Sequence, residues 1–193
     1  MRNYLIGAIA LVVLALGSAA IAAPGNGNRL YCFQGVDDGA NGTCTLAGGG
    51  AVLDTTDGNA DPNDNYAGVY VGNSKLEGRL LGDVEKLSFS YTGSPVVGGS
   101  PRFSIPIDED GDGTTESYAF ADAVGCSDGA GTVDVIDDAS CLVSYDATYA
   151  SWAAFVAAHP TYRIASDAVT FIIADQSGDF VLTNVELRQQ PGK

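Results

Sequence analysis

Apolar and polar residues alternate along much of the chain, which is the period-2 pattern of half-buried β-strands. The alternation is strict in Lys86–Tyr91 and continues in Arg102–Ile107. Two longer segments with strand-like composition, Ala168–Ala174 and Asp179–Leu187, lie near the C-terminus. The other runs with strand-like composition are Arg29–Phe33, Thr43–Leu46, Ala51–Leu53, Gly68–Val71, Ser117–Phe120 and Thr132–Ile136. Many short strands separated by Gly, Asn, Asp and Ser predict an all-β fold, an antiparallel β-sandwich of the jelly-roll kind.

One segment has helical periodicity instead. Within Thr148–Ala158, the residues Trp152, Phe155 and Val156 stand at positions i, i+3 and i+4. Pro160 then ends the pattern, because proline cannot continue a helix. We expect one short helix with Trp152 packed into the core. The alternative for Trp152 is an exposed ring that stacks on a sugar.

The N-terminal segment has the composition of an export signal. A short basic start at Arg2 is followed by Leu5–Ala23, 19 residues without a charge. The triplet Ala20-Ile21-Ala22 fits the A-x-A rule, so we expect a signal helix that is cleaved after Ala22. Residues 1–22 would then be the signal peptide, and residues 23–193 one secreted, extracellular β-sandwich domain. The alternative is an uncleaved anchor, because such a stretch can just span a bilayer of about 30 Å.

The chain is strongly acidic. It contains 24 Asp and Glu residues against nine Lys and Arg, for a net charge of −15. Loss of Arg2 with the signal peptide would bring this to −16. A surface of this charge repels nucleic acid and anionic lipid, so we expect neither nucleic acid nor a membrane as a partner of the mature protein.

The four cysteines predict disulfides, because an even count in an exported chain is typical of them. Three pairings are possible. We expect Cys32–Cys44 and Cys126–Cys141, since each pair brackets a loop rich in Gly and Asp. The alternative is a zinc site, but the chain has no C-x-x-C spacing and its one histidine is His159.

The segment Asp108–Glu116 (D-E-D-G-D-G-T-T-E) has the spacing of a calcium loop. Carboxylates stand at positions 1, 3 and 5, Gly113 at position 6 permits the sharp bend, and position 7 offers a backbone carbonyl. This pattern predicts calcium as a cofactor. The expected ligands are Asp108, Asp110, Asp112, the Thr114 carbonyl and Glu116.

The loop departs from an EF-hand at its end and in its surroundings. Position 12 is Ala119 where a bidentate Glu is needed, and both flanks have strand patterns. We expect the missing ligand to come from Asp122 or from an Asp of another loop. The alternative is a solvated hairpin without an ion. A second segment, Asp57–Asn65, also carries oxygen side chains at alternate positions, but Pro62 stands where Gly is needed, which favours a disordered polar loop.

Catalytic signals are weak. His159 lies at the end of the expected helix, and no G-x-S-x-G follows a strand. A carboxylate pair for glycoside hydrolysis is the remaining enzymatic alternative. The side chains expected to form a partly exposed aromatic surface are Tyr66, Tyr70, Tyr91, Tyr118, Tyr145, Tyr149 and Tyr162.

Three segments resemble secreted jelly-roll modules. Leu81–Tyr91 resembles a framework strand of the kind L-S-F-x-Y, and Pro101–Gly113 resembles the hairpin that follows it. Val169–Leu187 resembles the closing pair of strands, with Thr183 in place of the usual Asp of a D-N-V sequence. The resemblance covers residues 66 to 187 and is to galactose-binding-like and carbohydrate-binding-module-like sandwiches.

The resemblance implies sugar binding, adhesion or structural support, and the weak catalytic signals favour a binding module over an enzyme. Our leading hypothesis is a secreted, calcium-stabilised sandwich that binds a glycan or a cell-surface polymer. The alternatives are a structural cell-surface or matrix protein that interacts with other proteins, and a small glycoside-acting hydrolase. Fold alone does not decide among these.

Overall fold

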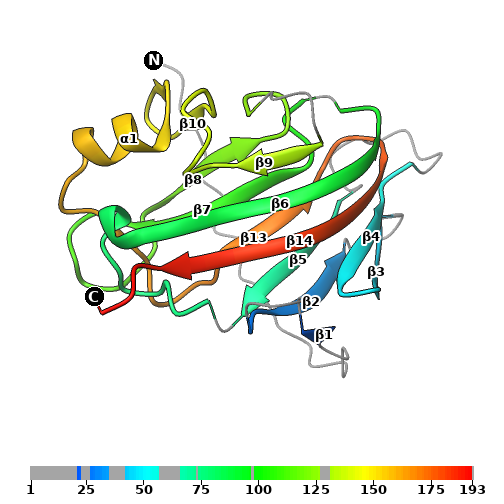
Figure 1. The fold of residues 1–193 in the computed structure, drawn as a ribbon, viewed down its shortest axis with the longest axis horizontal. Helices are drawn as coiled ribbons and strands as arrows, with labels where there is room; N and C mark the ends of the chain where they lie inside the picture. Colours follow the sequence, from blue (N-terminus) through cyan, green and yellow to red (C-terminus); the bar gives the residue numbers. More distant parts are fainter. Residues whose placement is uncertain are drawn as a thin grey trace, which may run out of the picture.

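The computed structural model describes residues 21–22, 27–34, 42–56, 66–72, 74–96, 98–126 and 131–192. About half of them form antiparallel strands, in two sheets that pack against each other (Figure 1). The predicted all-β sandwich is therefore confirmed. The expected signal peptide lies outside the described residues, except for the backbone of Ile21–Ala22.

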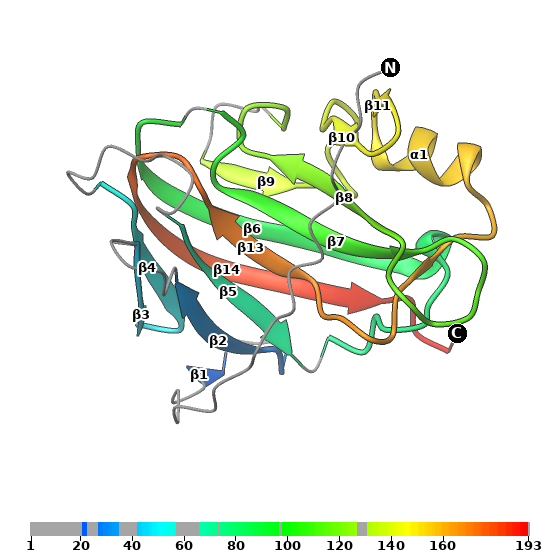
Figure 2. The same cartoon turned by 180° about the vertical axis from the view of Figure 1, so that it is seen from behind.

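The larger sheet has nine strands, and its central strands face the viewer in Figure 2. In spatial order they are β1 (Ile21–Ala22), β2 (Arg29–Gln34), β5 (Ala67–Gly72), β13 (Phe171–Ala174), β7 (Arg102–Asp108), β8 (Ser117–Asp122), β10 (Val143–Ser144) and β11 (Thr148–Tyr149), with β12 (Arg163–Ile164) also paired to β7. Strand β13 enters between β5 and β7, so the chain returns late to complete the centre of this sheet.

The smaller sheet has five strands, with β6 and β14 crossing the front of Figure 1. Its spatial order is β3 (Thr43–Ala47), β4 (Gly50–Asp54), β14 (Asp179–Gln189), β6 (Val84–Ser94) and β9 (Thr132–Asp134). Strands β6 and β14 have 11 residues each and pair along nearly their whole length. The last strand again lies in the middle of its sheet.

The core lies between the two sheets because alternate side chains of each strand point inward. Phe89 of β6 and Phe103 of β7 are fully buried, and their ring centroids lie 5.0 Å apart across the sandwich. The other large, fully buried side chains include Leu30, Leu53, Leu87, Ile105, Ile107 and Phe180. This alternation leaves one outer face on each sheet.

Two short helical elements join the strands. The 3-10 helix η1 (Leu81–Asp83) precedes β6, and α1 (Trp152–Ala158) follows β11. The predicted start of the helix at Thr148 is wrong, because Thr148–Tyr149 pair with Val143–Ser144 as strands. The helix begins after Ser151, whose hydroxyl accepts a hydrogen bond from the Ala154 N–H at 3.2 Å. Trp152 is 5 % exposed, so its predicted core position is confirmed.

Both predicted disulfides are present. Cys32 bonds to Cys44 with the two Cα atoms 5.5 Å apart, and Cys126 bonds to Cys141. Disulfides persist in oxidising compartments, so the fold fits an oxidising environment. Within the part of the chain that the structure describes, none of the helices has the length and hydropathy that a bilayer crossing requires.

Candidate metal centre and the aromatic sheet face

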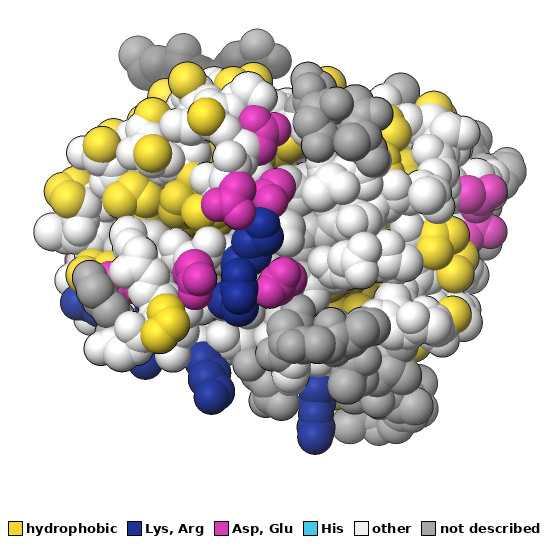
Figure 3. Space-filling view, viewed as in Figure 1, with side chains coloured by type: hydrophobic (Ala, Val, Ile, Leu, Met, Phe, Trp, Pro, Cys, Tyr) yellow, Lys and Arg dark blue, Asp and Glu magenta, His cyan; other side chains and the backbone are white. Residues whose placement is uncertain are grey.

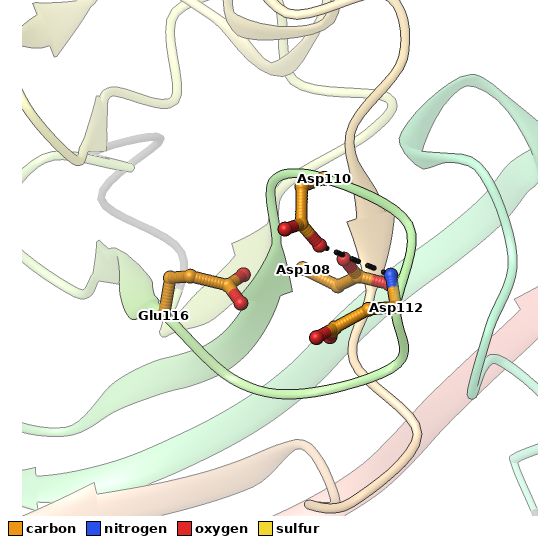
Figure 4. A group of neighbouring side chains, drawn as sticks. All are labelled: Asp108, Asp110, Asp112 and Glu116. Atoms are coloured by element: carbon orange, nitrogen blue, oxygen red, sulfur yellow. Dashed lines mark hydrogen bonds between the residues drawn. The ribbon is translucent and has the colours of Figure 1, made fainter.

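The acidic loop joins β7 to β8 at one end of the larger sheet (Figure 4). Asp108 is the last residue of β7, and Ser117 begins β8. Gly111 and Gly113 both have positive φ values, of 87° and 91°, which let the chain turn twice within three residues. The expected strand flanks are confirmed, and the loop is a hairpin connection.

The buried carboxylate of Asp108 anchors the loop through hydrogen bonds. Its side chain is 1 % exposed, and its two carboxylate oxygens accept hydrogen bonds from the Gly111 N–H at 2.6 Å and the Gly113 N–H at 3.0 Å. The turn takes these two N–H groups out of the hydrogen-bond pattern between strands, and the carboxylate accepts their hydrogen bonds instead. The carboxylate is therefore fixed in place before any ion binds.

The other three carboxylates lie at the surface of the loop. Asp110 accepts a hydrogen bond from the Asp112 N–H at 3.1 Å, and Asp112 accepts from the N–H and the hydroxyl of Thr114. The Thr114 bonds hold the pKa of Asp112 below its usual value. Glu116 accepts from the Glu109 N–H at 2.8 Å and from the Thr114 hydroxyl at 3.0 Å. Local hydrogen bonds thus orient each acidic side chain.

Together the four side chains form a cluster suited to a cation. One carboxylate oxygen from each of Asp108, Asp110, Asp112 and Glu116 lies within 4.8 Å of the others. Figure 4 shows the four carboxylates converging on the inside of the turn. Carboxylate oxygens are the preferred ligands of hard divalent cations, and like charges held this close repel one another when no cation is present. The cluster could therefore hold a metal ion.

Four of the five predicted ligands are thus brought together by their side chains. Thr114 belongs to the same loop, and its hydroxyl binds two of the carboxylates, while a role for its carbonyl stays a prediction. Asp122 was the wrong candidate for a further ligand, because it lies at the far end of β8 opposite Arg102. Its carboxylate accepts hydrogen bonds from the N–H groups of Val124 and Gly125.

An acidic side chain from another loop does approach. Asp167 accepts a hydrogen bond from the Thr115 hydroxyl at 2.6 Å, and its N–H lies 3.2 Å from the Gly113 carbonyl. Spacing within the loop could not identify Asp167, because β8, β9, β10, β11, α1 and β12 separate it from the loop along the chain. The second predicted cation segment, Asp57–Asn65, lies outside the described residues.

Glu109 points away from the cluster and fixes the loop to its neighbours. Its carboxylate accepts hydrogen bonds from the hydroxyl groups of Tyr145 and Tyr162. Burial, together with this carboxylate, raises the pKa of both tyrosines. His159 stacks on Tyr162 at 4.4 Å between ring centroids, and its Nε2 lies 2.8 Å from the Tyr149 hydroxyl. These contacts connect the acidic loop to α1.

A second carboxylate contact joins β4 and β14 of the smaller sheet. Hydrogen bonds from Thr56 lower the pKa of Asp54, whereas the bond to Asp54 raises the pKa of Asp179. Asp179 is exposed. The pair therefore lacks the enclosed setting that keeps a catalytic carboxylic acid protonated near neutral pH.

The outer face of the larger sheet carries aromatic side chains in adjacent strands. We call this surface the aromatic sheet face. Its members are half-buried, and they are Tyr31, Phe33, Tyr70, Tyr118, Phe120 and Phe171, with Tyr66 at its border. Of the tyrosines predicted to form a partly exposed surface, only Tyr66, Tyr70 and Tyr118 lie here. Tyr145, Tyr149 and Tyr162 surround His159, and Tyr91 packs near Phe89.

Comparison with known proteins gives no relative. No family model matches the chain, and no curated protein or solved structure shows a significant match.

Proposed function

We propose that this chain is a secreted, non-catalytic β-sandwich module that is stabilised by calcium and binds a glycan or another cell-surface polymer. The observation that carries the proposal is the β7–β8 loop, in which a buried Asp108 and three surface carboxylates converge. Oxygen-only ligand sets of this kind suit Ca²⁺, which accepts irregular geometry, better than Mg²⁺, which demands a near-ideal octahedron.

The module's acidity and its aromatic sheet face support a polymer-binding role. Half-buried aromatic rings in adjacent strands place flat apolar area on an outer sheet face, and apolar surface of this kind can mark an interaction site. The enzymatic alternative has less support, because His159 is engaged by Tyr149 and enclosed by aromatic rings. The alternative of a protein-binding matrix component predicts binding to proteins and none to glycans.

Glycan-array binding in calcium and in EDTA tests the proposal. We expect the wild-type protein to bind a subset of neutral glycans in calcium and to bind them more weakly in EDTA, because an empty loop destabilises the domain. A protein that remains folded in calcium and binds no glycan or surface polymer would contradict the polymer-binding role.

Export is tested at the N-terminus. N-terminal sequencing of protein recovered from culture medium is expected to begin at Ala23, since cleavage after Ala22 fits the A-x-A rule. Cleavage there would also remove β1, so β2 would become the edge of the larger sheet. Recovery of an intact Met1 in the membrane fraction would show that the segment is an anchor.

A further inference from the structure

The outer faces of the two sheets differ sharply in chemistry. On the smaller sheet, the outward positions of β6, β9 and β14 carry serine, threonine and ion pairs, and Figure 3 shows Lys and Arg side chains lying between Asp and Glu on this side. Lys86 lies 2.5 Å from Asp134, and Arg188 lies 3.0 Å from Glu186. That face is an ordinary solvated surface. The aromatic sheet face on the opposite side is not.

Strand register builds the aromatic sheet face from distant parts of the chain. Tyr31 of β2 lies opposite Tyr70 of β5, and Tyr70 lies opposite Phe171 of β13. The same row crosses Ser104 of β7 and ends at Phe120 of β8. Four steps between strands at about 4.8 Å each give a row of about 19 Å.

The rings form a continuous series. Phe33 lies 4.5 Å from Tyr70, Tyr70 lies 5.9 Å from Phe171, and Phe171 lies 5.7 Å from Tyr118, measured between ring centroids. Tyrosine hydroxyls are protonated at neutral pH and can donate hydrogen bonds, and burial raises the pKa of Tyr70 and of Tyr118 further. The surface therefore combines flat apolar rings with uncharged hydroxyl groups.

Two glycines let rings lie against the sheet. A Cβ atom at Gly68 would lie 2.4 Å from the Phe33 ring, and one at Gly72 would lie 2.9 Å from the Tyr31 ring. Both rings thus cover the β5 backbone at positions without a side chain. Both side chains remain half-buried, so part of each stays exposed at the surface.

Two charged side chains on this face form an ion pair. Arg102 pairs with Asp175 through two hydrogen bonds, and Ser100 donates a third to the same carboxylate. The Arg102 guanidinium also lies 5.2 Å from the centre of the Phe120 ring. The charge of Arg102 is thus compensated, while the whole chain, with a net charge of −15, repels polyanions.

We infer that the aromatic sheet face is the ligand-binding surface and that its ligand is a neutral polysaccharide. The C–H groups on one side of a sugar ring are slightly positive and match the negative face of an aromatic ring. Sugar hydroxyls can bond to the tyrosine hydroxyls at the border of each ring. A second copy of this chain is disfavoured as the occupant, because each copy carries a net charge of −15 and the two chains repel each other. This inference rests on the proposed polymer-binding function and names its site and ligand class.

The test compares Tyr70→Phe with Tyr70→Leu. The first keeps a flat ring, and the second keeps apolar area without one. Binding is measured in calcium by native electrophoresis through gels that contain xyloglucan, galactomannan or mixed-linkage glucan, and by pull-down on cellulose and chitin, with polygalacturonate as the charged polymer. Val181→Ala, an exposed residue of the smaller sheet, is the matched control.

We expect wild type to bind at least one neutral polysaccharide and not polygalacturonate. Tyr70→Leu should weaken this binding about ten-fold, a change typical of the loss of one aromatic contact, while Tyr70→Phe and Val181→Ala bind like wild type. Circular dichroism verifies that each variant is folded. Should Tyr70→Leu fail to fold, Tyr118→Phe and Tyr118→Leu serve as the pair, since the Tyr118 ring contacts Phe171 at the border of the series.

Each other outcome has a definite meaning. Wild-type binding that persists in the leucine variants would overturn the site while leaving the polymer-binding function intact. Equal losses of polysaccharide binding in Tyr70→Phe and Tyr70→Leu would show that the Tyr70 hydroxyl determines binding. This result would overturn ring stacking. A dimer in analytical ultracentrifugation that Tyr70→Leu dissociates would make the face a self-association surface. A folded wild type that binds no polymer would overturn the proposed function, and the inference with it.

Discussion

Calcium is expected to raise the melting temperature of this protein by about 5–10 °C when the free ion reaches 100 times its dissociation constant. Ligand linkage at that ratio contributes about 2.7 kcal/mol to the free energy of unfolding. For a domain of this size each kcal/mol raises the melting temperature by about 2–4 °C. The physical source is the relief of repulsion among Asp108, Asp110, Asp112 and Glu116, whose oxygens lie within 4.8 Å of one another.

The measurement is a thermal unfolding series in EDTA and in increasing calcium. Extracellular calcium modules have dissociation constants of about 0.1–1 mM, so the titration should extend to about 50 mM. Magnesium at equal concentration controls for ionic strength and should have a smaller effect, because it requires octahedral geometry.

A double variant, Asp110→Asn with Asp112→Asn, separates the ion from the loop. Asn keeps an oxygen that accepts the bonds from the Asp112 and Thr114 N–H groups, but it removes two of the four clustered negative charges. We expect the calcium response to flatten while the melting temperature in EDTA stays equal or rises. Identical wild-type melting curves in EDTA and in excess calcium would show that the loop is only a solvated turn.

Much of the fold was predictable because its signals are local. Strict alternation in Lys86–Tyr91 marks a strand with one buried face, and that segment lies inside β6. The Asp-x-Asp-x-Asp-Gly spacing fixes which carboxylates share one side of a turn, so the cluster followed from sequence alone. The disulfides were predictable for the same reason, since each closes a short loop of its own.

The errors also have physical causes. The helix was predicted to begin at Thr148, although the helical spacing starts only at Trp152 and Ser151 is a favourable N-cap residue that marks the true start. Asp122 was proposed as a metal ligand, but six extended residues of β8 carry it about 20 Å from the loop. Strand geometry alone excludes it.

The aromatic sheet face could not be predicted, because it depends on pairing between distant segments. Phe33 and Phe171 are far apart in sequence, and only the entry of β13 beside β5 brings their rings within 5.7 Å. Alternation shows that each residue lies on one face of its own strand, but not which strands are neighbours. Gly68 and Gly72 give a local signal in hindsight, since glycine inside a strand often marks close approach by another group.

The replacement Asp108→Ala is expected to lower the melting temperature even in EDTA, by about 3–10 °C. The change removes the acceptor of the Gly111 and Gly113 N–H groups, and two hydrogen bonds of about 0.5–1.5 kcal/mol each contribute about 1–3 kcal/mol. Release of a buried charge offsets part of this loss. The variant should also lose its calcium response, because Asp108 is both an anchor of the loop and a predicted ligand.

Asp110→Ala is the matched control, since Asp110 belongs to the same cluster but is exposed. Thermal unfolding in EDTA should leave this variant within about 2 °C of wild type, as expected for a surface substitution. If Asp108→Ala has the same melting temperature as wild type in EDTA, the Asp108 carboxylate contributes nothing to the stability of the empty loop. It then acts at most as a ligand. If Asp110→Ala falls as far as Asp108→Ala, the loop is held by the whole cluster and not by the buried carboxylate beneath it.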